Sequence, residues 1–279
     1  MRHVRRLVAL YRIQLTMDFI WVVRDFRNFV SYYLCEIVLG AASVATTLLL
    51  AERFGGIGGW SRDQVLFMLG YAATASGVLE TIFAFNVRFI SRVIGRGQVD
   101  HWLVQPLRLP VAILAQGFAP FTGSAQTLPG LVLLVWAVPR AGVAVTPGWL
   151  ALFAVNMAAS TLIWMSYSFV WGSLAFWAPR AAEEVSSSAG RAVAQLQVFP
   201  LDGVPGPLVA GLVTSVPAGL IAWYPSRALL GLDPSPMAAF GTPLAALAAV
   251  TVAWWIFTRG LSHYARVGSS RYLSLGFRR

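Results

Sequence analysis

The sequence predicts an all-α, multi-pass membrane protein, and three observations lead to this fold class. The 279 residues are 57% hydrophobic and 11% charged, with a mean hydropathy of +0.67, whereas soluble domains are about 25% charged. Apolar segments of about 20 residues, the length that crosses a bilayer as a helix, recur along the chain. Arginines gather at the ends of these segments and not on one soluble face.

Residues 1–28 predict a basic amphipathic helix that lies in the membrane interface. Their apolar residues recur at helical spacing and form one broad stripe, and Arg5, Arg6 and Arg12 lie off that stripe. A disordered basic tail is the alternative, but such a tail has no reason to keep this period.

Six apolar segments predict six membrane-spanning helices in a single transmembrane domain. They are residues 29–51, 65–87, 111–137, 149–178, 207–224 and 237–258. Glycines and a proline between residues 117 and 123 soften the third segment. Pro217 and Gly219 break the fifth, so we expect a broken or re-entrant segment before the last span, which is tolerated only inside protein or against water. Ser61 and Gln64 have capping-box spacing and predict a helix start there.

The distribution of arginine predicts the orientation. Six spans place both termini on one side, and cytoplasmic segments carry the excess of positive charge. Segments 1–28, 88–110 and 178–200, together with the C-terminal tail, hold 17 of the 21 basic residues. The other four are Arg53, Arg62, Arg140 and Arg227. Both termini and the 88–110 loop are therefore predicted to be cytoplasmic.

Several functional classes are excluded by residues that the chain lacks. All 21 basic residues are arginine, so the chain has neither the lysine of a phosphate-binding loop nor that of a Schiff-base enzyme. Cys35 is the single cysteine, which excludes an intrachain disulfide and a thiolate metal cluster. The three histidines lie far apart, and no catalytic constellation is present. We therefore predict no catalytic residue, no metal site and no nucleic-acid partner.

Ionisable residues inside membrane segments are functional candidates. Glu36 and Glu80 are the two in this chain, and they either face a substrate path and gate protons, or anchor the helices by pairing with an arginine such as Arg27 or Arg88. Asn156 is a further candidate for the translocation path, with a hydrogen bond between helices as its alternative role.

Four stretches of the chain carry a family resemblance. They are GGIGGWSRDQVLFMLG, IGRGQVDHWLVQPLRLP, VPAGLIAWYPSRALLG and TRGLSHYARVGSS, in this order. The second is similar to the pattern I-x-R-G-E-[LV]-D-x-x-L-x-x-P-L, with Gln98 in place of the acid. On the basis of these four stretches, nearly the whole chain resembles the permease subunits of ABC-2-type transporters. The resemblance is to a subgroup in particular, in which paired permeases are encoded beside an ATP-binding protein.

This resemblance implies a six-helix fold in which the 88–110 loop supplies a coupling helix that docks in a groove of the ATPase. The residues expected to make that contact are Arg92, Arg96, Asp100, His101 and Trp102. The implied partners are ATP-binding cassette subunits, a second permease that is identical or a diverged sibling, and membrane lipid. ATP and magnesium would bind to the partner subunit, with no cofactor on this chain, and the location would be a bacterial plasma membrane.

The function implied by the resemblance is that of a permease subunit in an ATP-driven exporter of an amphiphilic, drug-like or lipid-linked substrate. Two alternatives stay open. An ion-coupled secondary transporter would use Glu36 and Glu80, and a membrane-embedded lipid-modifying enzyme would need acids or histidines clustered at one membrane face. The arginines of the 88–110 loop also have a simpler role available, anchoring against anionic lipid.

Overall fold

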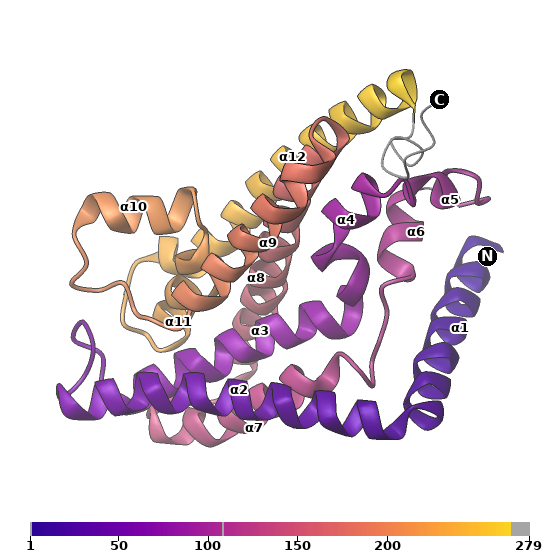
Figure 1. Ribbon diagram of the computed structural model, residues 1–279. Coiled ribbons are helices and arrows are strands. Elements are labelled where there is room, and N and C mark those ends of the chain that lie inside the picture. Colours follow the sequence, from indigo (N-terminus) through magenta and orange to yellow (C-terminus); the bar gives the residue numbers. More distant parts are fainter. Residues whose placement is uncertain (1, 108, 269–279) are drawn as a thin grey trace.

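The computed structural model describes residues 2–107 and 109–268, and these residues form helices without a β-strand. The predicted all-α fold is therefore confirmed. Two layers of long helices make up most of the molecule (Figure 1). One contains α8 (Pro147–Ser173), α9 (Pro179–Leu196) and α12 (Pro236–Val267), and the other contains α2 (Phe26–Arg53), α3 (Arg62–Arg88) and α7 (Ser124–Arg140). Three arginines of the predicted C-terminal tail, Arg271, Arg278 and Arg279, lie outside the described residues.

Four helices are long and apolar enough to cross a membrane, namely α2, α3, α8 and α12, and a bent pair of shorter helices brings the number to five if it counts as one span. In the most apolar stretch of each helix, 72% of the residues of α3 are buried inside the protein, but only 11% of those of α2. Helix α3 is thus the central helix of the molecule. The outer face of α2 is apolar and exposed, as expected for contact with lipid.

Helix α1 (Arg2–Arg24) precedes α2 and turns sharply away from it at Asp25 (Figure 1). Asp18 fastens α1 to the loop before α7, because its carboxylate accepts hydrogen bonds from the backbone N–H groups of Phe121 at 2.7 Å and Thr122 at 3.3 Å. The Thr122 hydroxyl donates to the same carboxylate at 2.8 Å. The predicted N-terminal helix is present, and this contact ties it to the rest of the fold.

The turn between α2 and α3 is rich in glycine, and Gly58 has a φ of 60° and a backbone so close to Asp202 that no side chain fits there. The start of α3 has the predicted capping box. The backbone N–H of Gln64 donates to Ser61 Oγ at 3.3 Å, and Gln64 Oε1 accepts from the Ser61 N–H at 2.9 Å. These two bonds satisfy donors that the first helical turn leaves free.

The third predicted span, residues 111–137, is not a continuous helix. It is divided into α6 (Leu109–Ala115) and α7 by a non-helical stretch. Gly117, Pro120 and Gly123 cause the break, and the two glycines sit directly against the α3 backbone near Phe83 and Glu80, where a side chain would clash. The Ala119 N–H donates to the Thr81 carbonyl at 3.1 Å, so part of the freed backbone is satisfied inside the protein.

The fifth predicted span, residues 207–224, is also not one helix. It comprises α10 (Gly206–Thr214) and η2 (Gly219–Trp223), which continues into α11 (Tyr224–Leu229). The two halves are bent by 83° at the Pro217 region. This bend lies at the predicted break, and the segment is a pair of short helices.

The chain from α9 to Asp202 runs back along α3 from its C-terminal end to its N-terminal end. At its start, Glu183 pairs with Arg92, just beyond the C-terminal end of α3. After its last turn, Gln197 donates to Ser76 in the middle of α3 at 3.2 Å, and Asp202 accepts from the Trp60 indole at 2.5 Å, next to the N-terminal end of α3. Segment 178–200 was predicted to lie wholly on the side of the 88–110 loop. The contacts show instead that the segment starts at the end of the molecule that holds this loop and leads away from it.

The bent segment α10–α11 begins and finishes at the end of the molecule opposite the 88–110 loop. Asp202, just before α10, accepts from the indole N–H groups of Trp60 and Trp223 and pairs with Arg227 at 3.2 Å. The Leu229 carbonyl, where α11 ends, accepts from the Trp149 indole at 2.9 Å. We call this the far end of the molecule, and the end that holds the 88–110 loop the coupling end.

Candidate coupling site

The 88–110 loop folds into two short helices that follow α3 directly. They are α4 (Ile90–Gly95) and α5 (Val99–Leu103). The turn between them requires Gly97, whose φ is 67°. Figure 1 shows α4, α5, α6 and the C-terminal end of α12 together at the coupling end. We call α4, α5 and the turn between them the coupling segment.

The first tie of the coupling segment is to α9. Arg92 Nε lies 2.7 Å from Glu183 Oε1, and Arg96 lies 3.9 Å from the same atom. The Arg92 guanidinium also covers the Phe89 ring at 4.8 Å from its centroid. Both partners of the short ion pair are more than one-third exposed, so water screens the attraction, and the pair positions α4 against α9 more than it stabilises the fold.

The second tie is to α12. The Tyr264 hydroxyl donates to Asp100 Oδ1 at 2.7 Å. Tyr264 lies in the stretch TRGLSHYARVGSS, which carried part of the family resemblance. Its partner Asp100 was predicted to contact the ATPase, and the structure turns that carboxylate inward toward α12.

The third tie is to α6 and centres on Trp102. Its side chain is 7% exposed and packs in a hydrophobic cluster with Ile94, Ile113 and Phe176. The indole N–H donates to Gln116 Oε1 at 2.7 Å, and Gln116 Nε2 donates to Gln105 Oε1 at 2.7 Å. A buried indole with a satisfied N–H fixes the position of its helix, so Trp102 holds α5 to the membrane-embedded part of the protein.

The outer surface of the coupling segment is formed by other residues. Arg96 and His101 are exposed, and so are Leu103 (48%) and Val104 (82%). Of the five predicted contact residues, Arg96 and His101 thus lie on the surface, whereas Arg92, Asp100 and Trp102 bond within the chain. Sequence reasoning missed Glu183 and Tyr264, because no sequence pattern links residues about 90 and 160 positions away from their partners.

The two predicted intramembrane acids have polar partners. Glu80 pairs with Arg88 at 3.0 Å, one of the arginines expected for the anchoring role. Glu36 accepts from Gln126 Nε2 at 2.8 Å, so its partner is an amide on α7. These contacts leave both roles of the acids, path or anchor, as predictions.

Asn156, the third candidate for the path, is fully buried in α8. Its amide donates to the Leu152 carbonyl at 3.0 Å and to the Ala239 carbonyl of α12 at 3.4 Å. In this conformation the side chain joins α8 and α12, and its role in the translocation path stays a prediction.

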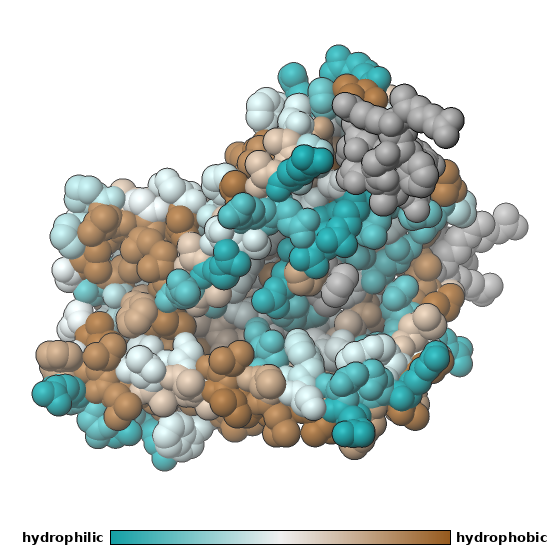
Figure 2. All heavy atoms as spheres, in the orientation of Figure 1, coloured by the Kyte–Doolittle hydropathy of each residue, from teal (hydrophilic) through white to brown (hydrophobic). Residues whose placement is uncertain are grey.

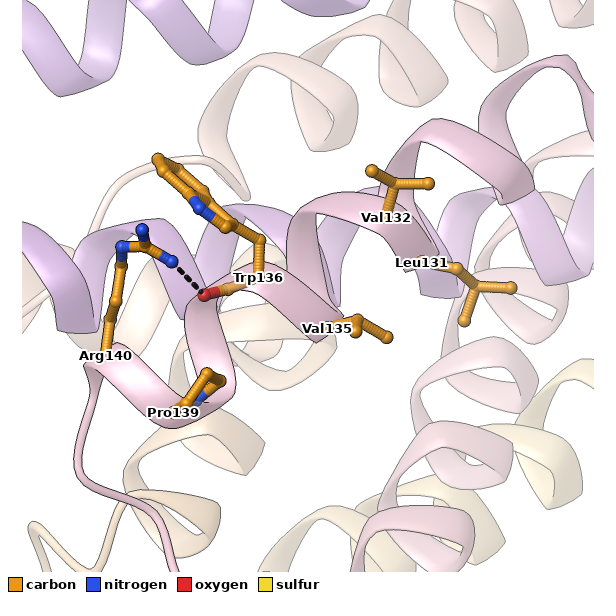
Figure 3. Close-up of a pocket in the computed structure, with 6 residues that line it drawn as sticks. All are labelled: Leu131, Val132, Val135, Trp136, Pro139 and Arg140. Atoms are coloured by element: carbon orange, nitrogen blue, oxygen red, sulfur yellow. Dashed lines mark hydrogen bonds between the residues drawn. The ribbon is translucent and has the colours of Figure 1, made fainter.

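Among the described residues, no three histidine, cysteine or acidic side chains come together in a group that could hold a metal ion. The depression shown in Figure 3 is apolar and open, and its six lining residues all belong to α7. Arg140 stacks on Trp136 at 4.0 Å there, an arrangement typical of a membrane interface. A one-sided surface of this kind encloses no ligand.

The family of the chain follows from a comparison with known protein families. A model described as "ABC-2 family transporter protein" matches residues 37–268, which is most of the chain. The chain belongs to the ABC-2 transporter family. ABC-2 permeases are membrane subunits that work with ATP-binding subunits, so this chain has a permease role, and its family gives no evidence of an enzymatic site of its own. No curated protein and no solved structure matches the chain.

Within an ABC-2 permease, the coupling segment has the geometry that a mechanical connection requires. Its outer surface is exposed among the residues that the structure describes, and its inner side is held by separate contacts to α9, α12 and α6. A displacement of the outer surface therefore acts on three different parts of the membrane domain.

Proposed function

We propose that this chain is the permease subunit of an ATP-driven exporter and that its coupling segment docks on a separate ATP-binding subunit. The observation that supports this best is the exposed surface of Arg96, His101, Leu103 and Val104 on a segment whose inner side is bonded to three helices. A mixed surface of apolar and cationic side chains suits a protein partner. ATP and magnesium would bind to that partner, and this chain would bind no cofactor.

The topology that we propose has six crossings, as predicted, but with a different fifth span. The crossings are α2, α3, the divided α6–α7 unit, α8, α9 and α12. Helix α9 replaces residues 207–224, because the chain from Glu183 in α9 to Asp202 runs from the C-terminal end of α3, past its middle at Ser76, to its N-terminal end, while α10–α11 starts and finishes at the far end. Arg191 would then lie in a spanning helix and would no longer count as cytoplasmic. The other arginines would still lie mostly on the cytoplasmic side. Both termini and the coupling segment would then face the cytoplasm of a bacterial cell.

The proposed mechanism transmits motion through the three ties. When two ATP-binding subunits close on ATP, they would displace the coupling segment of each of two permeases, identical or diverged. The Arg92–Glu183 pair would carry the displacement to α9, the Asp100–Tyr264 bond to α12, and Trp102 with Gln116 to α6. The path between the two permeases would open outward for an amphiphilic, drug-like or lipid-linked cargo.

Co-purification tests this function. The tagged chain, extracted from its native membrane in mild detergent, is expected to recover a P-loop ATPase together with ATP hydrolysis. Changing Arg96→Glu and His101→Ala together should lower the recovered ATPase about tenfold, because it removes polar contacts and reverses one charge at the docking surface.

The matched control is Arg140→Glu, a charge reversal at the far end, which should leave the recovery of ATPase unchanged. A chain that is purified alone, with no ATPase activity, would rule out the exporter and return attention to Glu36 and Glu80 in an ion-coupled carrier.

A further inference from the structure

Helix α9 has one polar face that none of the residues described by the structure covers. Its exposed residues include Glu184, Ser187, Ser188 and Arg191, which recur at the spacing of one helical stripe. The opposite face is apolar, with Val193 fully buried against Ile163 of α8. Figure 2 shows a hydrophilic band across this side of the molecule, over α9 and α4, with apolar surfaces over α10 and α2 on either side.

This face is unsuited to lipid. With 18 residues, α9 is about 27 Å long, close to the thickness of the hydrocarbon core. Arg191 lies about 18 Å from its first residue along the axis. Among the described residues, neither Glu184 nor Arg191 forms an ion pair, and the Arg191 guanidinium donates only to Ser188 Oγ, at 2.9 Å. A charged side chain at this depth faces protein, water or a ligand in membrane proteins, and not acyl chains.

Dry packing against a second copy of the chain is also excluded by the charges. In a two-fold symmetric pair, the same surface of each subunit meets its counterpart. With the symmetry axis along the membrane normal, Arg191 of one α9 would lie opposite Arg191 of the other, and Glu184 opposite Glu184. Like charges brought together without water are strongly unfavourable. The space between two such helices therefore requires water or a counter-charge.

We propose that the polar face of α9 lines a water-filled path between two permease subunits, and that Arg191 makes this path selective for amphiphiles with an anionic head group. The inference rests on the proposed exporter function and narrows its cargo. An arginine offers several donors to phosphate, sulfonate or carboxylate oxygens. The hydroxyl group of Ser188, which accepts from Arg191, can add a neutral donor beside it.

Cysteine labelling tests the water-filled path, and the chain is well suited to it because Cys35 is its single cysteine. In a Cys35→Ser background, Ser187→Cys should react with charged methanethiosulfonate reagents in native membranes. The control is Thr251→Cys, an exposed position midway along α12, which should stay unmodified because charged reagents do not enter hydrocarbon. Ala144→Cys, in the exposed loop after α7, confirms that the reagents reach the protein.

Reagent charge tests the selectivity. Relative to its ratio at Ala144→Cys, the anionic sulfonatoethyl reagent should be favoured over the cationic trimethylammonium reagent at Gln195→Cys by about fivefold, the effect of one nearby positive charge in partly screened surroundings. Gln195 is exposed one turn beyond Arg191 and lies about three turns from Glu184, so the acid affects it little. Adding Arg191→Gln should abolish this preference and leave the cysteine reactive.

Two results would overturn the inference. An unreactive Ser187→Cys, with Ala144→Cys fully labelled, would show that the face is dry. A charge preference that is absent, or that persists in Arg191→Gln, would show that Arg191 does not select anions. Labelling needs no ATPase, so failure here is distinct from failure of the exporter function, which appears as a chain purified without ATPase.

Discussion

Replacing Trp102 by alanine is expected to lower the melting temperature of the detergent-solubilised protein by about 10 °C and the ATPase turnover of the complex about tenfold. Truncating a buried aromatic side chain costs about 3–5 kcal/mol. Trp102 is 7% exposed, packs in the cluster at the coupling end and is hydrogen-bonded to Gln116. Without it, α5 loses its attachment to α6, and a displacement of the coupling segment is no longer transmitted to α6.

His101→Ala is the matched control, because His101 is the exposed neighbour of Trp102 on the same short helix. Its melting temperature should stay within about 1 °C of the parent, as is usual for a surface substitution. Trp102→Phe should retain most of the stability but lose the bond to Gln116. Equal stability in Trp102→Ala and His101→Ala, or a turnover in Trp102→Ala equal to that of the parent, would contradict the role assigned to the buried indole.

Gly77→Ala is expected to destabilise the permease although it adds a single methyl group. A Cβ at Gly77 would overlap the backbone of Thr127 in α7, and Gly70 and Gly130 are similarly close to the facing helix. Small residues let helix backbones approach closely in membranes. Forcing α3 and α7 apart should cost about 1–3 kcal/mol, which lowers the melting temperature by about 3–10 °C.

Gly40→Ala in α2 provides the comparison, since nothing lies within 4 Å of a Cβ built at Gly40. In the absence of a clash, alanine is favoured over glycine in a helix by up to about 1 kcal/mol, so this variant should be as stable as the parent or slightly more stable. If Gly77→Ala also proved neutral or stabilising, the close approach of α3 and α7 would not hold in solution.

Much of the fold could be predicted from local sequence features. Continuous apolar runs marked α2, α3, α8 and α12, and the spacing of Ser61 and Gln64 marked the start of α3. Helix α9 was not identified as a crossing helix, because hydropathy detects helices that face lipid. Its residues Glu184, Ser187, Ser188 and Arg191 are polar, and only long-range contacts show that the chain from α9 to Asp202 runs back along α3.

The coupling site was predictable in its location but not in its internal arrangement. The motif around Asp100 and Trp102 indicated which loop to examine. It could not show that Asp100 points to Tyr264 or that Trp102 is buried, because these orientations depend on α12 and α6, which are distant in the sequence. Likewise, the weak helix propensity of Gly117 and Gly123 indicated a break there. The sequence could not show that both glycines pack directly against the backbone of α3, where a side chain would clash.

The central claim is that the ATP-binding subunit docks on the outer surface of the coupling segment, and site-specific photocross-linking tests it most directly. A photoreactive amino acid at His101 or Val104, both exposed at the coupling end, should cross-link the permease to the ATPase in native membranes. The same amino acid at Arg140, at the far end, should not. Cross-linking from Arg140, or none from His101 and Val104 while the ATPase still co-purifies, would contradict this account.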